Sequence, residues 1–136
     1  MFMKKNLNNF WWIVFAAGLI AIDQFTKYVA VHNFNDSVLY NIGSAFSMPI
    51  PTWIIFLITL IYVGVSIYFF RKETVYSVKL TWVFIFCGAV SNFVDRVRIG
   101  KVIDFIDLHF WPVFNVADVF LSVGALMLLY YYVIKK

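Results

Sequence analysis

The sequence predicts an all-α membrane protein of four transmembrane helices, with a small extracytoplasmic loop region that can hold a β-hairpin. Two observations lead to this fold class. Of the 136 residues, 63% are hydrophobic and only 13% are charged, and a soluble domain of this length could not cover its surface with so little charge. Four apolar stretches, separated by short polar connections, are each close to the ~20 residues that cross a bilayer as a helix.

The four predicted spans follow one another without room for a second domain. They cover approximately residues 10–31, 53–70, 78–94 and 116–134. We therefore expect residues 1–136 to form a single four-span domain, and an even number of spans places both termini on the same side of the membrane. A cleaved signal peptide is an alternative interpretation of the first span, but cleavage would discard the polar pair Asp23 and Lys27.

The charged residues divide between the two ends of the predicted helices. Seven of the eleven basic residues lie at the termini or between the second and third spans, together with one acid, which gives that side a formal charge of +6. The other four basic residues and six acids give the opposite side −2. Basic segments stay in the cytoplasm, so we expect both termini there and the acids at the extracytoplasmic face. The net charge of +4 thus reflects topology and not nucleic-acid binding.

Ionisable residues inside apolar sequence mark the candidate site, because they are costly at membrane depth and are usually kept for a function or a buried pairing. Asp23 and Lys27 stand at i, i+4 in "DQFTK", a spacing that allows an ion pair, and a structural pair and direct substrate contact are equally open. In "SNFVDR", Asn92, Asp95 and Arg96 share one helix face. A structural clamp, in which Asp95 pairs with Arg96 or Lys27, is the favoured interpretation.

The segment "FNVAD" opens the fourth span and holds a further polar pair. Asn115 and Asp118 suit a helix N-terminal cap, but Asp104 in "GKVIDF" interrupts apolar sequence where no cap is needed. Two carboxylates in a poorly solvated site share a proton, so one can take a proton from water while the other donates to a carbonyl oxygen. Such a pair hydrolyses peptide bonds without a nucleophilic side chain or a metal. Asn41 in "NIGSAF" is the loop side chain expected to face this site.

Other hydrolytic chemistry has little support in the sequence. The two histidines, His32 and His109, lack the spacing of zinc ligands, and the single cysteine, Cys87, lies deep in a predicted span, where we expect a packing thiol. Gly88 and Ala89 beside it would let two helices approach closely. We therefore expect no metal and no cofactor.

Four ordered motifs, "DQFTK", "NIGSAF", "SNFVDR" with "KVIDF", and "FNVAD", resemble those of lipoprotein signal peptidase, or signal peptidase II, a family of bacterial four-span membrane aspartic proteases. The resemblance runs from about Asp23 to Gly124. It implies removal of signal peptides from diacylglyceryl-modified prolipoproteins in the bacterial inner membrane, with the cut before the lipidated cysteine. The departures are Ser91, where the family usually has glycine, and a short connection from His32 to Asn41.

The resemblance assigns the catalytic pair to Asp104 and Asp118. It implies supporting or substrate-contact roles for seven other residues: Asp23, Lys27, Asn41, Asn92, Asp95, Arg96 and Asn115. Asp95 is the rival for the first catalytic position, and we place it second because the neighbouring Arg96 would keep its carboxylate ionised and make it a poor proton donor. The implied partners are lipid-modified prolipoprotein signal peptides and membrane lipids, with no nucleic acid, and we expect a monomer.

A small proton-coupled transporter or channel subunit is the alternative function. Such a protein would use Asp23, Asp104 or Asp118 as a proton relay. A relay needs carboxylates near the membrane midplane, whereas these lie at the ends of the predicted spans. A non-catalytic scaffold that kept the fold is a third alternative, and the pairing of Asp104 with Asp118 speaks against it.

Overall fold

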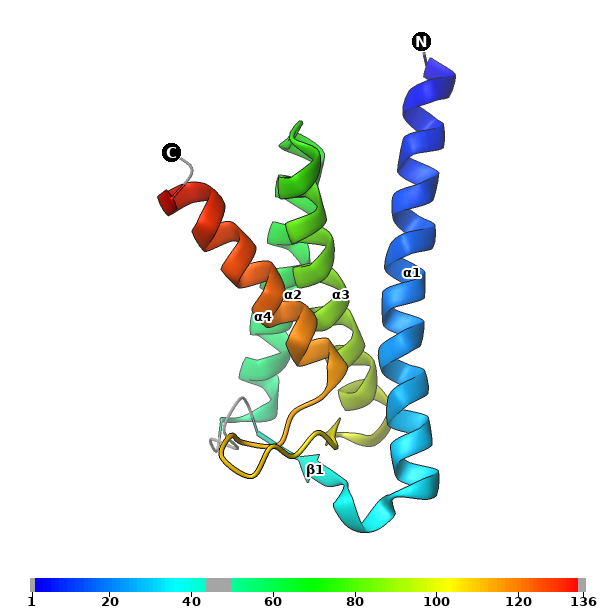
Figure 1. Cartoon of the computed structure of the whole chain (residues 1–136), viewed down its shortest axis with the longest axis vertical. Coiled ribbons are helices and arrows are strands. Elements are labelled where there is room, and N and C mark those ends of the chain that lie inside the picture. The colour runs from blue at the N-terminus through cyan, green and yellow to red at the C-terminus, as the bar shows by residue number, and fades with distance from the viewer. Residues whose placement is uncertain (1, 44–49, 135–136) are drawn as a thin grey trace.

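The structure, a computed structural model, describes residues 2–43 and 50–134 and consists of four long helices with a small sheet at one end (Figure 1). The helices are α1 (Phe2–Asn33), α2 (Thr52–Lys72), α3 (Tyr76–Ile99) and α4 (Val116–Leu129), and a π-helical turn over Tyr130–Ile134 extends α4. Counted with that extension, all four are long and apolar enough to cross a membrane. The predicted fold class is confirmed.

Helix α3 is the centre of the bundle. Of its most apolar window, 56% is buried, whereas the corresponding windows of the other three helices are less than one fifth buried. Figure 1 shows α1 on one side of α3 and α2 with α4 on the other. The core consists of Val78, Trp82 and Ile85 of α3, packed against Phe70, Leu121, Leu128 and Tyr131. The outward-facing apolar side chains of the other helices suit a lipid surrounding.

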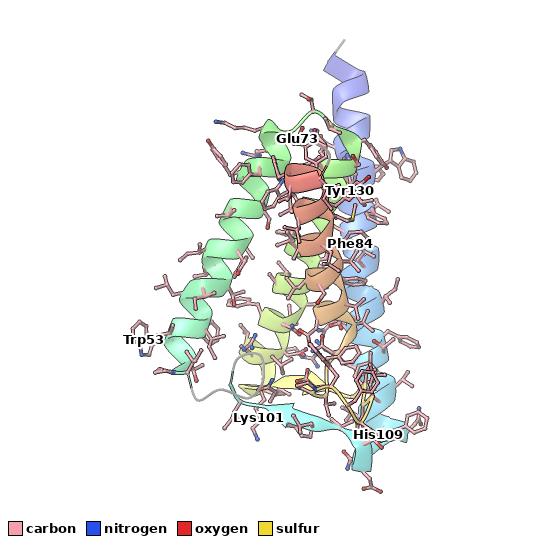
Figure 2. The ribbon with its side chains drawn as sticks, turned by 60° about the vertical axis from the view of Figure 1, so that its left-hand side comes forward. Trp53, Glu73, Phe84, Lys101, His109 and Tyr130 are labelled. Carbon is pink, nitrogen blue, oxygen red and sulfur yellow. The ribbon has the colours of Figure 1, made fainter. Side chains whose placement is uncertain are left out.

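The two ends of the bundle differ in what they carry. The start of α1, the end of α4 and the α2–α3 connection with Glu73 lie at one end (Figures 1 and 2). Lys101 and His109, in the connection between α3 and α4, lie at the opposite end (Figure 2). The division of charge in the sequence is therefore a division between the two ends of one bundle.

The small sheet joins two connections that are far apart in the sequence. Strand β1 (Leu39–Asn41) pairs antiparallel with β2 (Val102–Asp104), and Leu39 lies opposite Asp104. The β-structure expected after the first span is confirmed, but its partner strand comes from the loop after α3 and not from the same loop. The remainder of the expected hairpin, residues 44–49, lies outside the described residues.

Two local features bring the start of α4 back to β2. Gly100 ends α3 in the left-handed conformation, with φ of 72°, and its N–H donates to the last turn of the helix, a cap that glycine adopts without strain. Backbone hydrogen bonds between Ile106 and Phe114, at 2.8 and 3.1 Å, then close the following loop. As a result, Asn115 lies beside Asp104.

Helices α3 and α4 approach closely at Gly88. A Cβ atom on this residue would lie 2.5 Å from the carbonyl oxygen of Ala117 and 2.6 Å from Cγ of Leu121. The close helix packing expected from the sequence is confirmed, because only glycine leaves room for this contact. The neighbouring Cys87 is fully buried and its Sγ lies 3.5 Å from the carbonyl oxygen of Ala16, as expected for a packing thiol.

Candidate active site

Asp104 occupies the last position of β2 and is held by two amide groups. The Nδ2 of Asn115 donates to its Oδ1 at 2.7 Å, and the Nδ2 of Asn41 donates to its Oδ2 at 3.1 Å. The residue is 2% exposed. Burial and the negative charge of Asp118 raise the pKa of Asp104 to about 6, although the two amide donors and Lys27 oppose the rise. This carboxyl group therefore keeps its proton closer to neutral pH than an ordinary aspartate does.

Asp118 lies in the first turn of α4, where it forms a capping box with Asn115. The backbone N–H of Asp118 donates to Oδ1 of Asn115 at 2.9 Å, and the backbone N–H of Asn115 donates to Oδ2 of Asp118 at 3.2 Å. The other carboxylate oxygen, Oδ1, accepts a hydrogen bond from Nδ2 of Asn92 at 2.8 Å. The cap expected from the sequence is confirmed. It uses one carboxylate oxygen of Asp118, and the other oxygen bonds to Asn92.

Two asparagine side chains connect the carboxylates to each other and to a buried cation. Nδ2 of Asn115 contacts Oδ1 of Asp104 and also donates to Oδ1 of Asn92 at 3.0 Å. Nζ of Lys27 donates to the same Asn92 oxygen at 3.0 Å. Because amides carry no net charge, this network orients both carboxylates without fixing the charge of either.

Lys27 is the centre of a buried ion cluster. Its Nζ lies 2.7 Å from Oδ2 of Asp23 and 2.7 Å from Oδ2 of Asp95, and these side chains are at most 1% exposed. Of the two partners considered for Asp95, the structure shows Lys27, so the argument that Arg96 holds Asp95 was wrong. Arg96 is the next residue of the helix and so points about 100° away around its axis, where its Nη2 donates to the carbonyl oxygen of Gly43 at 3.3 Å.

Two residues to which sequence reasoning gave no role complete this cluster. Ser91 Oγ donates to Oδ2 of Asp23 at 2.6 Å, and Gln24 Nε2 donates to Oδ1 of Asp95 at 2.9 Å and to Ser91 Oγ at 3.0 Å. Asp23 also accepts the backbone N–H of Ala117 at 2.7 Å, which favours the N-terminus of α4. The sequence signal that could have identified Ser91 and Gln24 is a polar side chain inside an apolar span.

Both members of the aspartate pair face one cavity of about 530 Å³ between α2, α3, α4 and the loops. Five of the nine residues singled out in the sequence line it: Asn41, Asn92, Arg96, Asp104 and Asp118. The rest of its wall is mainly apolar and includes Ile55, Ile58, Ile85, Trp111, Leu121 and Ala125. A space of this size with polar groups at one end can hold a short segment of peptide.

The other four predicted residues do not line this cavity. Asn115 touches both carboxylates, and Asp23, Lys27 and Asp95 form the buried ion cluster. Within residues 2–43 and 50–134, no group of three or more His, Cys, Asp or Glu side chains could hold a metal ion. The cavity offers two carboxyl groups, Asp104 and Asp118, and the pKa of Asp104 is raised.

The chain is similar to known proteins in sequence and in fold. Residues 15–134 match the protein family described as Signal peptidase (SPase) II. A lipoprotein signal peptidase of Caldanaerobacter subterraneus subsp. tengcongensis is 36% identical over 141 residues, which cover 90% of this chain and 96% of that protein. One of Listeria monocytogenes serotype 4a is 36% identical across 83% of this chain and 86% of that protein. A bacterial membrane enzyme solved by the in meso method at 2.3 Å resolution superposes with a TM-score of 0.82 at 28% identity, covering 89% of this chain and 86% of that one.

Proposed function

The chain belongs to the signal peptidase II family, and from that membership we propose that Asp104 and Asp118 are the catalytic pair with which it cuts prolipoproteins. It is a membrane aspartic peptidase that removes prolipoprotein signal peptides. The observation that carries the assignment of the pair is its arrangement: both carboxylates line one cavity, and Asn115 contacts both. The transporter alternative loses support, because Asp104 lies in β2 and Asp118 in the first turn of α4, so neither is at midspan.

The proposed reaction requires one proton on the pair. The ionised carboxylate accepts a proton from a water molecule, whose oxygen attacks the scissile carbonyl carbon, while the protonated carboxyl group donates to the carbonyl oxygen. The tetrahedral intermediate collapses when the carboxyl group that took up the water proton passes it to the peptide nitrogen and the C–N bond breaks. One hydroxyl of the intermediate returns its proton to the other carboxylate as the new carbonyl group forms, which restores one proton on the pair. A pKa of about 6 for Asp104 supports a shared proton in weakly acidic to neutral solution.

The contacts of Asp95 support Asp104 as the first member of the pair. Asp95 bonds to Lys27 and Gln24 and is absent from the cavity wall. Its carboxylate lies 2.7 Å from Nζ of Lys27 and so belongs to the buried ion cluster. Its role in this proposal is to hold α1 against α3 behind the site.

The shape of the cavity supports a signal peptide as the occupant. Its apolar wall runs from the aspartates toward Ile85 and Ala125, which lie well inside the spans of α3 and α4. The end of a signal peptide can lie along this wall, with the scissile bond at the carboxylates. We propose that the cut lies before the lipid-modified cysteine, whose diacylglyceryl group then stays in the surrounding lipid.

The charge distribution supports an orientation with both termini in the cytoplasm. Among the described residues, the end of the bundle that holds the start of α1 and the α2–α3 connection carries five basic residues and one acid, and basic segments are retained in the cytoplasm. The aspartate pair then lies at the extracytoplasmic face, where water reaches it. We further propose that residues 1–136 act as one domain and as a monomer.

The test is cleavage of a purified, diacylglyceryl-modified prolipoprotein by the detergent-solubilised protein. Asp104→Asn and Asp118→Asn should each lower kcat by at least about 100-fold, since each removes one proton-transfer group. Asp107→Asn, which changes an exposed carboxylate of the same loop, should leave kcat unchanged. If a folded Asp104→Asn or Asp118→Asn variant keeps wild-type activity, that aspartate is not catalytic.

A further inference from the structure

A second cavity, of about 510 Å³, lies between α1, α2 and α3 at the end of the bundle remote from the aspartates. Its residues near the helix ends are polar: Asn9, Arg71 and Lys79. Deeper in the bundle its wall is apolar and includes Ile13, Ala16, Val83 and Phe86. The α2–α3 connection with Glu73 marks this end of the molecule in Figure 2. The cavity is thus amphipathic, with a basic mouth and an apolar floor.

The two basic side chains at the mouth have no acidic partner among the described residues. The salt bridges in that part of the chain involve Lys27 and His109, both remote from this cavity. Glu73, the acid at this end, accepts the backbone N–H groups of Thr74 and Val75 at 2.7 and 2.9 Å. The mouth therefore has an uncompensated positive charge.

We propose that this cavity binds an anionic glycerophospholipid, with its phosphate between Arg71 and Lys79 and its acyl chains on the apolar floor. The order of groups in such a lipid, a charged phosphate and then acyl chains, is the order of groups in the wall. Basic pockets between membrane helices are suited to anionic head groups. Under the orientation proposed above, the lipid belongs to the cytoplasmic leaflet, but the binding itself does not depend on that orientation or on the catalytic pair.

The positive charge of the mouth argues against two other occupants, a signal peptide and a second copy of this chain. The basic start of a signal peptide would be repelled by Arg71 and Lys79. A second copy of this chain would bring an end of the same positive charge against the mouth. A second copy would appear in the experiment below as a dimer mass.

The test is competition between phosphatidylglycerol and phosphatidylcholine for the purified full-length protein, read by native mass spectrometry. We expect preferential retention of phosphatidylglycerol, and Arg71→Gln and Lys79→Gln should each reduce the preference about fivefold, the effect of one basic residue near an anionic surface. Lys72→Gln is the matched control. Lys72 neighbours Arg71 but is outside the cavity wall, with its Nζ 4.6 Å from the centre of the Tyr68 ring.

Several outcomes would overturn the proposal. Equal retention of the two lipids would show that no site selective for anionic lipid exists. An equal loss of preference in Lys72→Gln would show that the preference comes from diffuse surface charge. Displacement of the lipid by millimolar inorganic phosphate would show a simple anion site, and a dimer mass without lipid would show a protein interface. Prolipoprotein cleavage in detergent reports that each variant is folded, because none of these residues touches the catalytic cavity.

Discussion

The side-chain nitrogen of Asn115 lies 2.7 Å from Oδ1 of Asp104, eleven residues earlier in the chain. The same asparagine caps α4 and donates its backbone N–H to Asp118. The folding of one helix terminus therefore also sets the relative position of the two proposed catalytic carboxylates. Since the linking group is a neutral amide, it adds no charge to either carboxylate.

Asn115→Asp should separate this positioning role from the helix cap. The substitution keeps an oxygen that can accept the N–H of Asp118 but removes the amide donor to Asp104. Loss of a hydrogen bond to a charged group should lower kcat about 10- to 100-fold, and the third carboxylate buried beside Asp104 and Asp118 should also lower the free energy of unfolding. Asn35→Asp, at an exposed position, should change neither quantity. An unchanged kcat in Asn115→Asp would show that the amide does not position the pair.

The pKa of Asp104 predicts a pH limit for activity. Because the pair must hold one proton, kcat/KM should fall as the pH rises above about 6, the pKa of Asp104. The carboxyl infrared band of this group should titrate at the same pH and be absent in Asp104→Asn. In Asp118→Asn it should titrate at lower pH, because a neighbouring charge that raises the pKa has been removed. A band that titrates near pH 4 in the wild type would contradict this account.

The same group makes stability depend on pH. Its pKa in the folded protein, about 6, exceeds its ordinary value of 3.8, so between these values the folded protein binds a proton that the unfolded chain has lost. The free energy of unfolding should therefore decrease as the pH rises from about 4 to about 6 and change little above that range. Denaturant titrations of wild type and Asp104→Asn at several pH values measure the difference. An identical pH dependence in both proteins would refute the link to Asp104.

Lys27→Met should destabilise the fold more than any exposed charge change. It leaves Asp23 and Asp95 buried without their shared cation, and breaking a buried ion pair costs about 3–5 kcal/mol in the free energy of unfolding. Lys101→Met removes an exposed cation whose Nζ lies 5.9 Å from the centre of the Tyr40 ring and should cost less than about 1 kcal/mol. Unfolding in detergent with increasing denaturant compares the two, and similar values would show that the cluster contributes little.

Gly88→Ala should disturb both the helix packing and the site. The added methyl would lie 2.5 Å from the carbonyl oxygen of Ala117, the residue before Asp118. Overpacking of this kind costs about 1–3 kcal/mol, and the shift of α4 should also lower kcat. Gly64→Ala is the matched control, because a Cβ atom there has no neighbour within 4 Å. If Gly88→Ala matched Gly64→Ala in stability and kcat, α4 could move away without cost to the site.

The sequence predicted those parts of the structure that depend on composition and on short spacings. Apolar runs of membrane length gave the four helices, and the i, i+3 spacing of Asn115 and Asp118 gave the cap. The partner of β1 was missed, because a strand of three residues has no local signal for a partner in another loop. The sequence left open whether Asp95 pairs with Arg96 or with Lys27, and the orientation of side chains around α3 decides for Lys27.

The hydrogen bond from the Ala117 backbone to Asp23 joins residues 94 positions apart, and this has a consequence for biosynthesis. A nascent chain that has placed only its first three helices in the membrane lacks both the donor to Asp23 and the residue that bridges the pair. The active site therefore cannot assemble until α4, the final helix, has left the ribosome and inserted. A truncated product of translation would be an inert membrane protein and not an unregulated protease.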